Sequence, residues 1–172
     1  MADLVTHVAA GLLVKALTRG PHLPTFLVGC VLPDAVSRVP TMGMTMLMHE
    51  GVPIPEMLIA GFYVLHMPLG IVPFCWLVAS LFPEGVRPHI WGNLVAGAAL
   101  HLALDVLQSH FGAGYLLFYP FSTWHWEAGL IGPEDSVFAA PVLAVVAGGL
   151  WWRARGKGGR PGSPSVGTSS GE

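Results

Sequence analysis

Apolar residues gather in five segments, which polar or glycine- and proline-rich stretches separate. The segments run from about residue 4 to 17, 23 to 39, 59 to 82, 90 to 107 and 136 to 152. A helix that spans a membrane needs about 20 apolar residues, and the last three segments approach that length. The first two are shorter and contain polar groups, so a tilted or partly submerged hairpin is expected there. The pattern predicts an all-α polytopic membrane bundle of about five helices.

The third segment contains two prolines, Pro68 and Pro73. Proline removes a backbone hydrogen bond and kinks a helix, which membrane helices tolerate when neighbours satisfy the freed carbonyls. His66 lies just before the first proline, where a bend and a free carbonyl can open a cavity. The alternative is that the prolines only shape helix packing.

The stretches between and after the segments complete the predicted organisation. A long outer loop is expected over residues 108–135, and the tail from residue 154 to 172 is rich in Gly, Ser and Pro. Such composition is typical of disorder. We therefore predict a single membrane-embedded helical domain over residues 1–153 and a disordered basic tail over residues 154–172.

Composition agrees with a membrane protein. Hydrophobic residues make up 53% of the chain and charged residues 10%, against about 25% charged residues in soluble domains. The net charge of -2 argues against a nucleic-acid partner. The two cysteines, Cys30 and Cys75, lie far apart in apolar segments without a CxxC motif, which argues against cysteine metal sites and redox chemistry.

Basic residues predict the orientation, because Lys and Arg favour cytoplasmic loops. The loop over residues 108–135 and the stretch over residues 40–57 contain neither residue and are expected outside. The C-terminus, the turn after the first segment and the turn after the third are expected inside. Arg38 is the one charge that disagrees. The basic residues that decide this assignment are Lys15, Arg19, Arg87, Arg153, Arg155, Lys157 and Arg160.

The sequence HLALD places His101 and Asp105 one helical turn apart inside the fourth segment. Residues at i and i+4 share one face of a helix. Ionisable groups are costly in a membrane and usually mark functional sites there. The alternative is a structural hydrogen-bonded pair.

Three further polar groups, His7, Asp34 and His66, lie in other apolar segments. Under the predicted orientation, all of them reach the depth of HLALD in the outer half of the membrane. Alone, His7 can be an interfacial residue, Asp34 a helix N-cap, and His66 a partner of a carbonyl freed by Pro68. Their common depth favours one shared site.

Imidazole and carboxylate ligands suit zinc, iron or manganese, and this mixture is typical of catalytic rather than structural zinc sites. We expect a divalent metal, with zinc favoured and manganese or iron as alternatives. A water bound at an open position would become a nucleophile near neutral pH, able to attack an ester or a phosphoester. One Asp can instead orient an imidazole.

The outer loop adds two candidate groups. His110 follows Asp105 by five residues and is a further candidate metal ligand. Glu127 is a candidate general base, so the candidate catalytic residues are Asp105 and Glu127. The many aromatic residues of this loop are typical of an interfacial belt.

In their order along the chain, the sequence elements TH, LPD, LHMPLG, HLALD and YPFS resemble the YdjM-like (DUF457) family of bacterial inner-membrane proteins, known as membrane-bound metal-dependent hydrolases. The resemblance covers roughly residues 5 to 122. It implies metal ligands at His7, Asp34, His66, His101 and Asp105, an order also similar to that of zinc-dependent phospholipase C. The chain departs from the family pattern after LPD, where Ala35, Val36 and Ser37 replace a second Asp.

Two functions remain open from the sequence. The first is a metal-dependent hydrolase of the bacterial inner membrane that acts on a lipid or phosphoester at the outer face, with membrane lipids as partners. The second is a non-catalytic integral membrane protein or a transporter-like metal conduit. A conduit predicts polar groups at several depths, whereas the inner half offers mainly Lys15 and Asn93.

Overall fold

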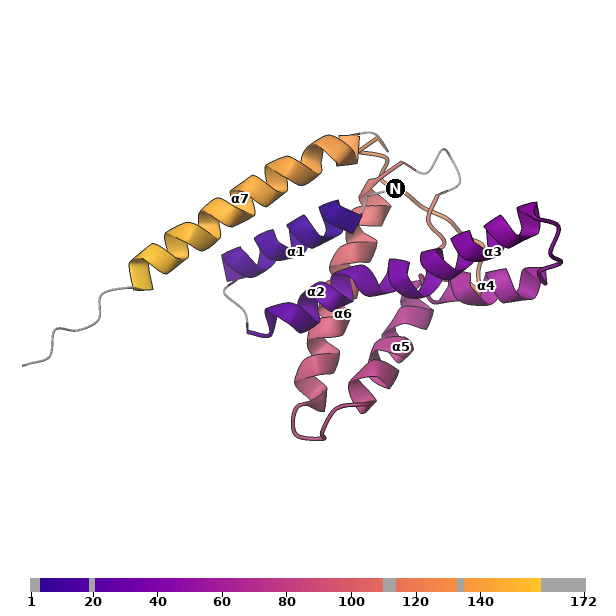
Figure 1. The fold of residues 1–172 in the computed structure, drawn as a ribbon, viewed down its shortest axis with the longest axis horizontal. Coiled ribbons are helices and arrows are strands. Elements are labelled where there is room, and N and C mark those ends of the chain that lie inside the picture. Colours follow the sequence, from indigo (N-terminus) through magenta and orange to yellow (C-terminus); the bar gives the residue numbers. More distant parts are fainter. Residues whose placement is uncertain (1–3, 19–20, 110–113, 133–134, 159–172) are drawn as a thin grey trace, which may run out of the picture.

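The computed structural model describes residues 4–18, 21–109, 114–132 and 135–158, and these residues form an all-α fold (Figure 1). The predicted helical class is therefore confirmed. Within the described ranges, β character is limited to isolated bridges between Gln108 and Ile131 and between Tyr115 and Trp126. The helical elements are α1 (Leu4–Thr18), α2 (Leu23–Pro33), the π-helical turn η1 (Asp34–Arg38), α3 (Val39–His49), α4 (Glu56–Val64), α5 (Pro68–Ser80), α6 (Arg87–Leu107) and α7 (Asp135–Gly158).

One described helix, α6, is by itself long and apolar enough to cross a membrane. Helices α4 and α5 meet the same criterion only as a pair that is bent by 73°. Helix α1 and the apolar part of α7 are shorter. The continuous rod of α2, η1 and α3 crosses α6 rather than running beside it (Figure 1). The fold is thus helical with one candidate span, which is a coarser arrangement than the predicted bundle of five.

The stretch over residues 40–57, which was expected outside, is helical in its first part. Helix α3 continues there to His49. Proline at the start of α3 suits the first turn of a helix, and the methionines that follow are good helix formers. The absence of Lys and Arg, on which the expectation rested, carries information on sidedness but not on secondary structure.

Large apolar side chains cover much of the outside of α5 and α7. A soluble monomer seldom exposes so much contiguous apolar surface, whereas a helix that faces lipid does. The most exposed of these side chains on α5 and α7, and just beyond α5, are Leu77 (59%), Leu81 (81%), Phe138 (75%), Val142 (63%), Val145 (75%) and Trp152 (82%).

Helices α2 and α6 meet through glycines. A Cβ added to Gly97 would collide with the carbonyl oxygen of Phe26, and one added to Gly29 would collide with that of Leu94. Small residues let two helix backbones touch in this way. The backbone contact brings the end of α2 against the middle of α6, where His101 lies.

The third apolar segment breaks where the sequence predicted a bend. Helix α4 ends at Val64, and Pro68 begins α5. His66 lies in the break, and its carbonyl oxygen accepts a hydrogen bond of 3.2 Å from the hydroxyl of Tyr115. Pro73 lies inside α5 without interrupting it. One proline therefore makes the break, and the loop after α6 satisfies the carbonyl that the break frees.

Helix α7 lies along α1 at the edge of the molecule (Figure 1). The indole nitrogen of Trp151 donates a hydrogen bond of 3.3 Å to the carbonyl of Leu12. The helix continues to Gly158, past the domain end predicted at residue 153. Residues 159–172 of the predicted tail lie outside the described residues.

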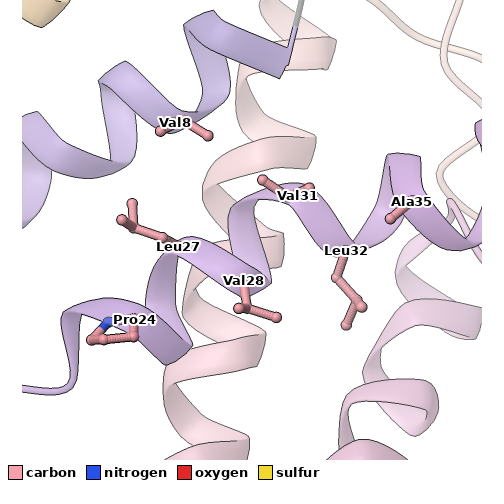
Figure 2. A pocket seen from close by; sticks show the side chains of 7 residues that line it. All are labelled: Val8, Pro24, Leu27, Val28, Val31, Leu32 and Ala35. Atoms are coloured by element: carbon pink, nitrogen blue, oxygen red, sulfur yellow. The ribbon is translucent and has the colours of Figure 1, made fainter.

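An apolar cavity of about 420 Å³ lies against α1 and α2 (Figure 2). The described residues that line it are all apolar. In this respect it resembles the exposed apolar surface of α5 and α7. The lining residues are Val8, Pro24, Leu27, Val28, Val31, Leu32 and Ala35.

We expect Gly97→Ala to lower the free energy of unfolding by about 1–3 kcal/mol, because the added methyl group would force α2 and α6 apart. Gly92→Ala on the same helix is the matched control, since a Cβ there meets no atom within 4 Å. The control should leave stability unchanged or raise it by up to about 1 kcal/mol, because Ala is the better helix former. Thermal unfolding in detergent measures both, and equal effects would contradict the proposed backbone contact.

Candidate metal centre

Four parts of the chain bring five ionisable side chains together. His7 comes from α1, Asp34 from η1, His66 from the break between α4 and α5, and both His101 and Asp105 from α6. All five are buried, and His7, His101 and Asp105 have no exposed surface. The predicted convergence of these residues is therefore confirmed, although they are far apart in sequence.

Asp105 lies at the centre of the cluster and faces three imidazoles. Its Oδ1 lies 3.4 Å from Nε2 of His7, and its Oδ2 lies 3.4 Å from Nε2 of His101. Oδ2 also lies 2.9 Å from Nε2 of His66, which is a hydrogen-bond distance. The rings of His7 and His101 are stacked with their centroids 3.8 Å apart.

Asp34 closes the other side of the cluster. Its Oδ1 lies 3.6 Å from Nδ1 of His66 and 3.7 Å from Nε2 of His101. The same oxygen forms an ion pair with Nε of Arg38 at 3.0 Å. Asp34 thus connects the buried imidazoles to a cation at the edge of the site.

These groups form two triads that share His101. The first contains His7, His101 and Asp105, the second Asp34, His66 and His101, and the ligand atoms within each lie within 4.8 Å of one another. Zinc with bonds of about 2.0–2.2 Å in tetrahedral geometry places its ligand atoms about 3.4 Å apart. The spacings of 3.4 to 3.7 Å in the cluster therefore fit a metal better than direct hydrogen bonds.

The tautomer of His101 strengthens this interpretation. Its Nδ1 lies 2.7 Å from the carbonyl oxygen of Cys30 and donates a hydrogen bond to it. In the neutral ring, Nε2 then carries a lone pair and faces the oxygens of Asp34 and Asp105. A lone pair opposite two carboxylates is repulsive, and a cation between them makes the contact attractive.

Several buried atoms of the cluster make no hydrogen bond to the described residues. An unsatisfied buried polar atom costs about 1–3 kcal/mol, and such atoms are rare. Here they face one another from separate helices, so a single ion can satisfy several of them. We conclude that the residues fit a divalent metal. The atoms are Nδ1 and Nε2 of His7, Nδ1 of His66, Nε2 of His101 and Oδ1 of Asp105, and Oδ1 of Asp34 has an ion pair with Arg38 in place of a hydrogen bond.

A widened helical turn presents Asp34 and Arg38. The amide of Val39 donates to the carbonyl of Asp34, five residues back, as in a π-helix. Pro40 gives a physical reason for this turn, because its ring would collide with the carbonyl of Val36 in a regular α-helix. Single π-turns of this kind occur often at functional sites.

A cavity of about 330 Å³ lies beside the cluster, and His66 belongs to both. Burial raises the pKa of Tyr115 well above its ordinary value, so its phenol stays protonated and can donate to the His66 carbonyl. The cavity therefore has a wall that is tied to the break between α4 and α5. The lining residues are Ser37, Arg38, Thr41, Met42, Tyr63, His66, Gly114 and Tyr115.

Two candidate residues from the sequence remain. His110 lies outside the described residues. Glu127 is half-buried in the loop after α6 and belongs to neither triad. The amide of the next residue, Ala128, donates to the carbonyl of Val106 at 2.8 Å, which keeps this part of the loop at the end of α6 that carries Asp105.

Sequence reasoning missed two groups of the site. Arg38 was treated only as an exception to the charge pattern, although its spacing of four residues from Asp34 could have suggested the ion pair. The Cys30 carbonyl is a backbone group, and only the contact of α2 with α6 reveals it. No protein-family model matches the chain, and comparison with curated proteins and with solved structures found no match either.

We expect His101→Ala to lower the affinity for divalent metal by more than about tenfold, since even partners that only support a ligand contribute about 10- to 100-fold. His89→Ala is the matched control, because His89 is exposed on the same helix and belongs to neither triad. Mass spectrometry of metal content in purified protein, followed by zinc titration, measures both. Equal metal content in the two variants would argue against the site.

Proposed function

We propose that the chain is a membrane-bound metal-dependent hydrolase that cleaves an ester or a phosphoester of a lipid or of another substrate at the membrane. The observation that carries this proposal is the set of buried imidazole and carboxylate atoms that face one another without hydrogen bonds. Structural zinc sites are commonly rich in cysteine, whereas mixed His and carboxylate sites are typical of catalysis.

A divalent ion bound by these residues would lower the pKa of a bound water toward neutrality and so supply a nucleophile. His7 and His101 would bind the ion through neutral imidazoles. Asp105 would contribute a carboxylate oxygen and orient His66 through their hydrogen bond. Glu127, in the loop that the Ala128 amide bonds to the end of α6, is the proposed proton acceptor. Zinc is the favoured ion, with manganese or iron as alternatives.

The sequence supports the same function through its resemblance to the YdjM-like family, since the proposed ligands follow that family's order. A place in the bacterial inner membrane, a cytoplasmic C-terminus and a site toward the outer face belong to the proposal. Support for a membrane comes from α6 and from the exposed apolar side chains of α5 and α7.

A metal conduit is the second candidate function, and the described residues favour it less. Lys15 and Asn93 are the main polar groups that the sequence places in the inner half. Nζ of Lys15 donates a hydrogen bond of 2.9 Å to Oδ1 of Asn93. Between Asn93 and His101, the buried face of α6 consists of Leu94, Gly97 and Ala98. Eight residues of helix span about 12 Å, which leaves an apolar barrier on the buried face of α6 between the cluster and the next polar pair.

We expect the metal-loaded protein to hydrolyse a chromogenic ester or phosphodiester in detergent, to lose this activity on chelation and to regain it with zinc. Asp105→Asn should lower the rate by about 100-fold or more, because it removes a carboxylate that binds the ion and orients His66. Asp135→Asn is the matched control, since Asp135 is exposed at the start of α7. The control should keep both metal and rate.

The opposite result is equally clear. The protein would be a conduit if it bound stoichiometric metal, hydrolysed neither type of substrate and transported metal into proteoliposomes. This transport would then depend on Asp34. A wild-type protein that binds no metal would exclude both functions.

A further inference from the structure

The cavity beside His66 is built by five parts of the chain. Ser37 and Arg38 come from η1, Thr41 and Met42 from α3, and Tyr63 from α4. His66, which belongs to the break, and Tyr115, which belongs to the loop after α6, complete it. A ligand in this cavity would therefore lie directly against the metal centre.

Arg38 is the one residue of permanent charge that lines this cavity among the described residues. Its Nε contacts Asp34, and its side chain remains 23% exposed. A guanidinium carries five N–H donors, so one contact leaves donors for a ligand. Arginine suits phosphate in particular, because its planar fork matches two oxygens at once.

The charges of the site call for an anion. Asp34 and Asp105 contribute two negative charges and Arg38 one positive charge, while His101 would be neutral as a metal ligand, because its Nε2 lone pair would bind the ion and its Nδ1 would donate to Cys30. With the other two imidazoles neutral, a divalent ion leaves the site with a net charge of about +1. An unbalanced charge is costly in a buried site, and one further negative group removes the imbalance.

Two of the helices that line the cavity, α3 and α4, lie beside each other (Figure 1) and carry exposed apolar side chains. They expose the side chains of Met42 (59%), Met46 (63%), Met57 (85%) and Leu58 (48%). Flexible methionine side chains adapt to varied apolar ligands. A ligand with an anionic end and an apolar remainder therefore matches both the cation inside and the surface outside.

We propose that this cavity binds the phosphoryl group of the substrate, with Arg38 as its cationic partner. The inference rests on the proposed hydrolase function and narrows its substrate class to phosphoesters. The phosphoryl group can belong to a lipid headgroup or to a soluble phosphoester. The exposed methionines favour the lipid, and the experiment below distinguishes the two sources.

The first test measures binding of inorganic phosphate to the zinc-loaded protein by titration calorimetry in detergent, together with metal content. Arg38→Gln should keep the metal and weaken phosphate binding about 10- to 100-fold, because a charge-assisted hydrogen bond is lost. Arg38→Lys should recover part of the affinity, since it restores the charge but not the fork. Unchanged phosphate affinity in a metal-loaded Arg38→Gln protein would overturn the inference.

A second pair of variants decides the matter if Arg38→Gln loses its metal through the ion pair with Asp34. Met42→Glu places a negative charge at the cavity, whereas Met46→Glu places the same charge one turn further along α3, outside the lining residues. Met42→Glu should weaken phosphate binding by about tenfold or more, and Met46→Glu should leave it unchanged. Equal effects would overturn the inference.

A further measurement distinguishes a lipid from a soluble source of the phosphoryl group. Dioleoyl phosphatidic acid in mixed micelles should bind more tightly than glycerol phosphate if the substrate is a lipid, and its binding should depend on Arg38. Preference for glycerol phosphate would support a soluble one. Absence of metal from the wild type would contradict the hydrolase proposal itself, whereas metal with phosphate binding that ignores Arg38 would contradict only the cavity inference.

Discussion

The direct contact between the backbones of α2 and α6 is the constraint on which the site depends. Gly29 and Gly97 allow it, and it brings the carbonyl of Cys30 within 2.7 Å of His101 Nδ1. That hydrogen bond fixes the tautomer, so the lone pair of Nε2 faces Asp34 and Asp105. A wider separation of the helices would free the ring, and both triads would lose the ligand that they share. The chemistry of the cluster thus begins with two residues that have no side chain.

A cation in the cluster would make folding and metal binding depend on each other. Asp105 is fully buried and lies close to three imidazoles, yet several facing atoms make no hydrogen bond to the described residues. Without a cation, the packing of four separate elements must offset the free energy of burying these unsatisfied atoms. With a cation, the same atoms connect α1, η1, the break at His66 and α6. The free energy of metal binding is then part of the free energy of folding.

The sequence predicted the helical class, the break near Pro68 and the five residues that meet. These features follow from large free-energy penalties on isolated ionisable groups in apolar segments and on proline inside a helix. Ionisable groups in apolar segments are rare unless they have partners, and proline limits helices wherever it occurs. The arrangement was less predictable. The crossing of α2 over α6 depends on glycine contacts between distant segments, which neither hydropathy nor charge counts reveal. The ion pair of Arg38 with Asp34 joins residues four apart, a spacing that could have suggested it.

The break between α4 and α5 serves the site in two ways. It turns His66 toward Asp105 and Asp34, and it frees the carbonyl that Tyr115 satisfies. A continuous helix would bond that carbonyl internally and would have no need of the loop after α6. Because the break needs a donor, the loop becomes a wall of the cavity rather than only an aromatic belt. One proline therefore links three features: the orientation of His66, the position of a distant loop and a wall of the cavity beside the cluster.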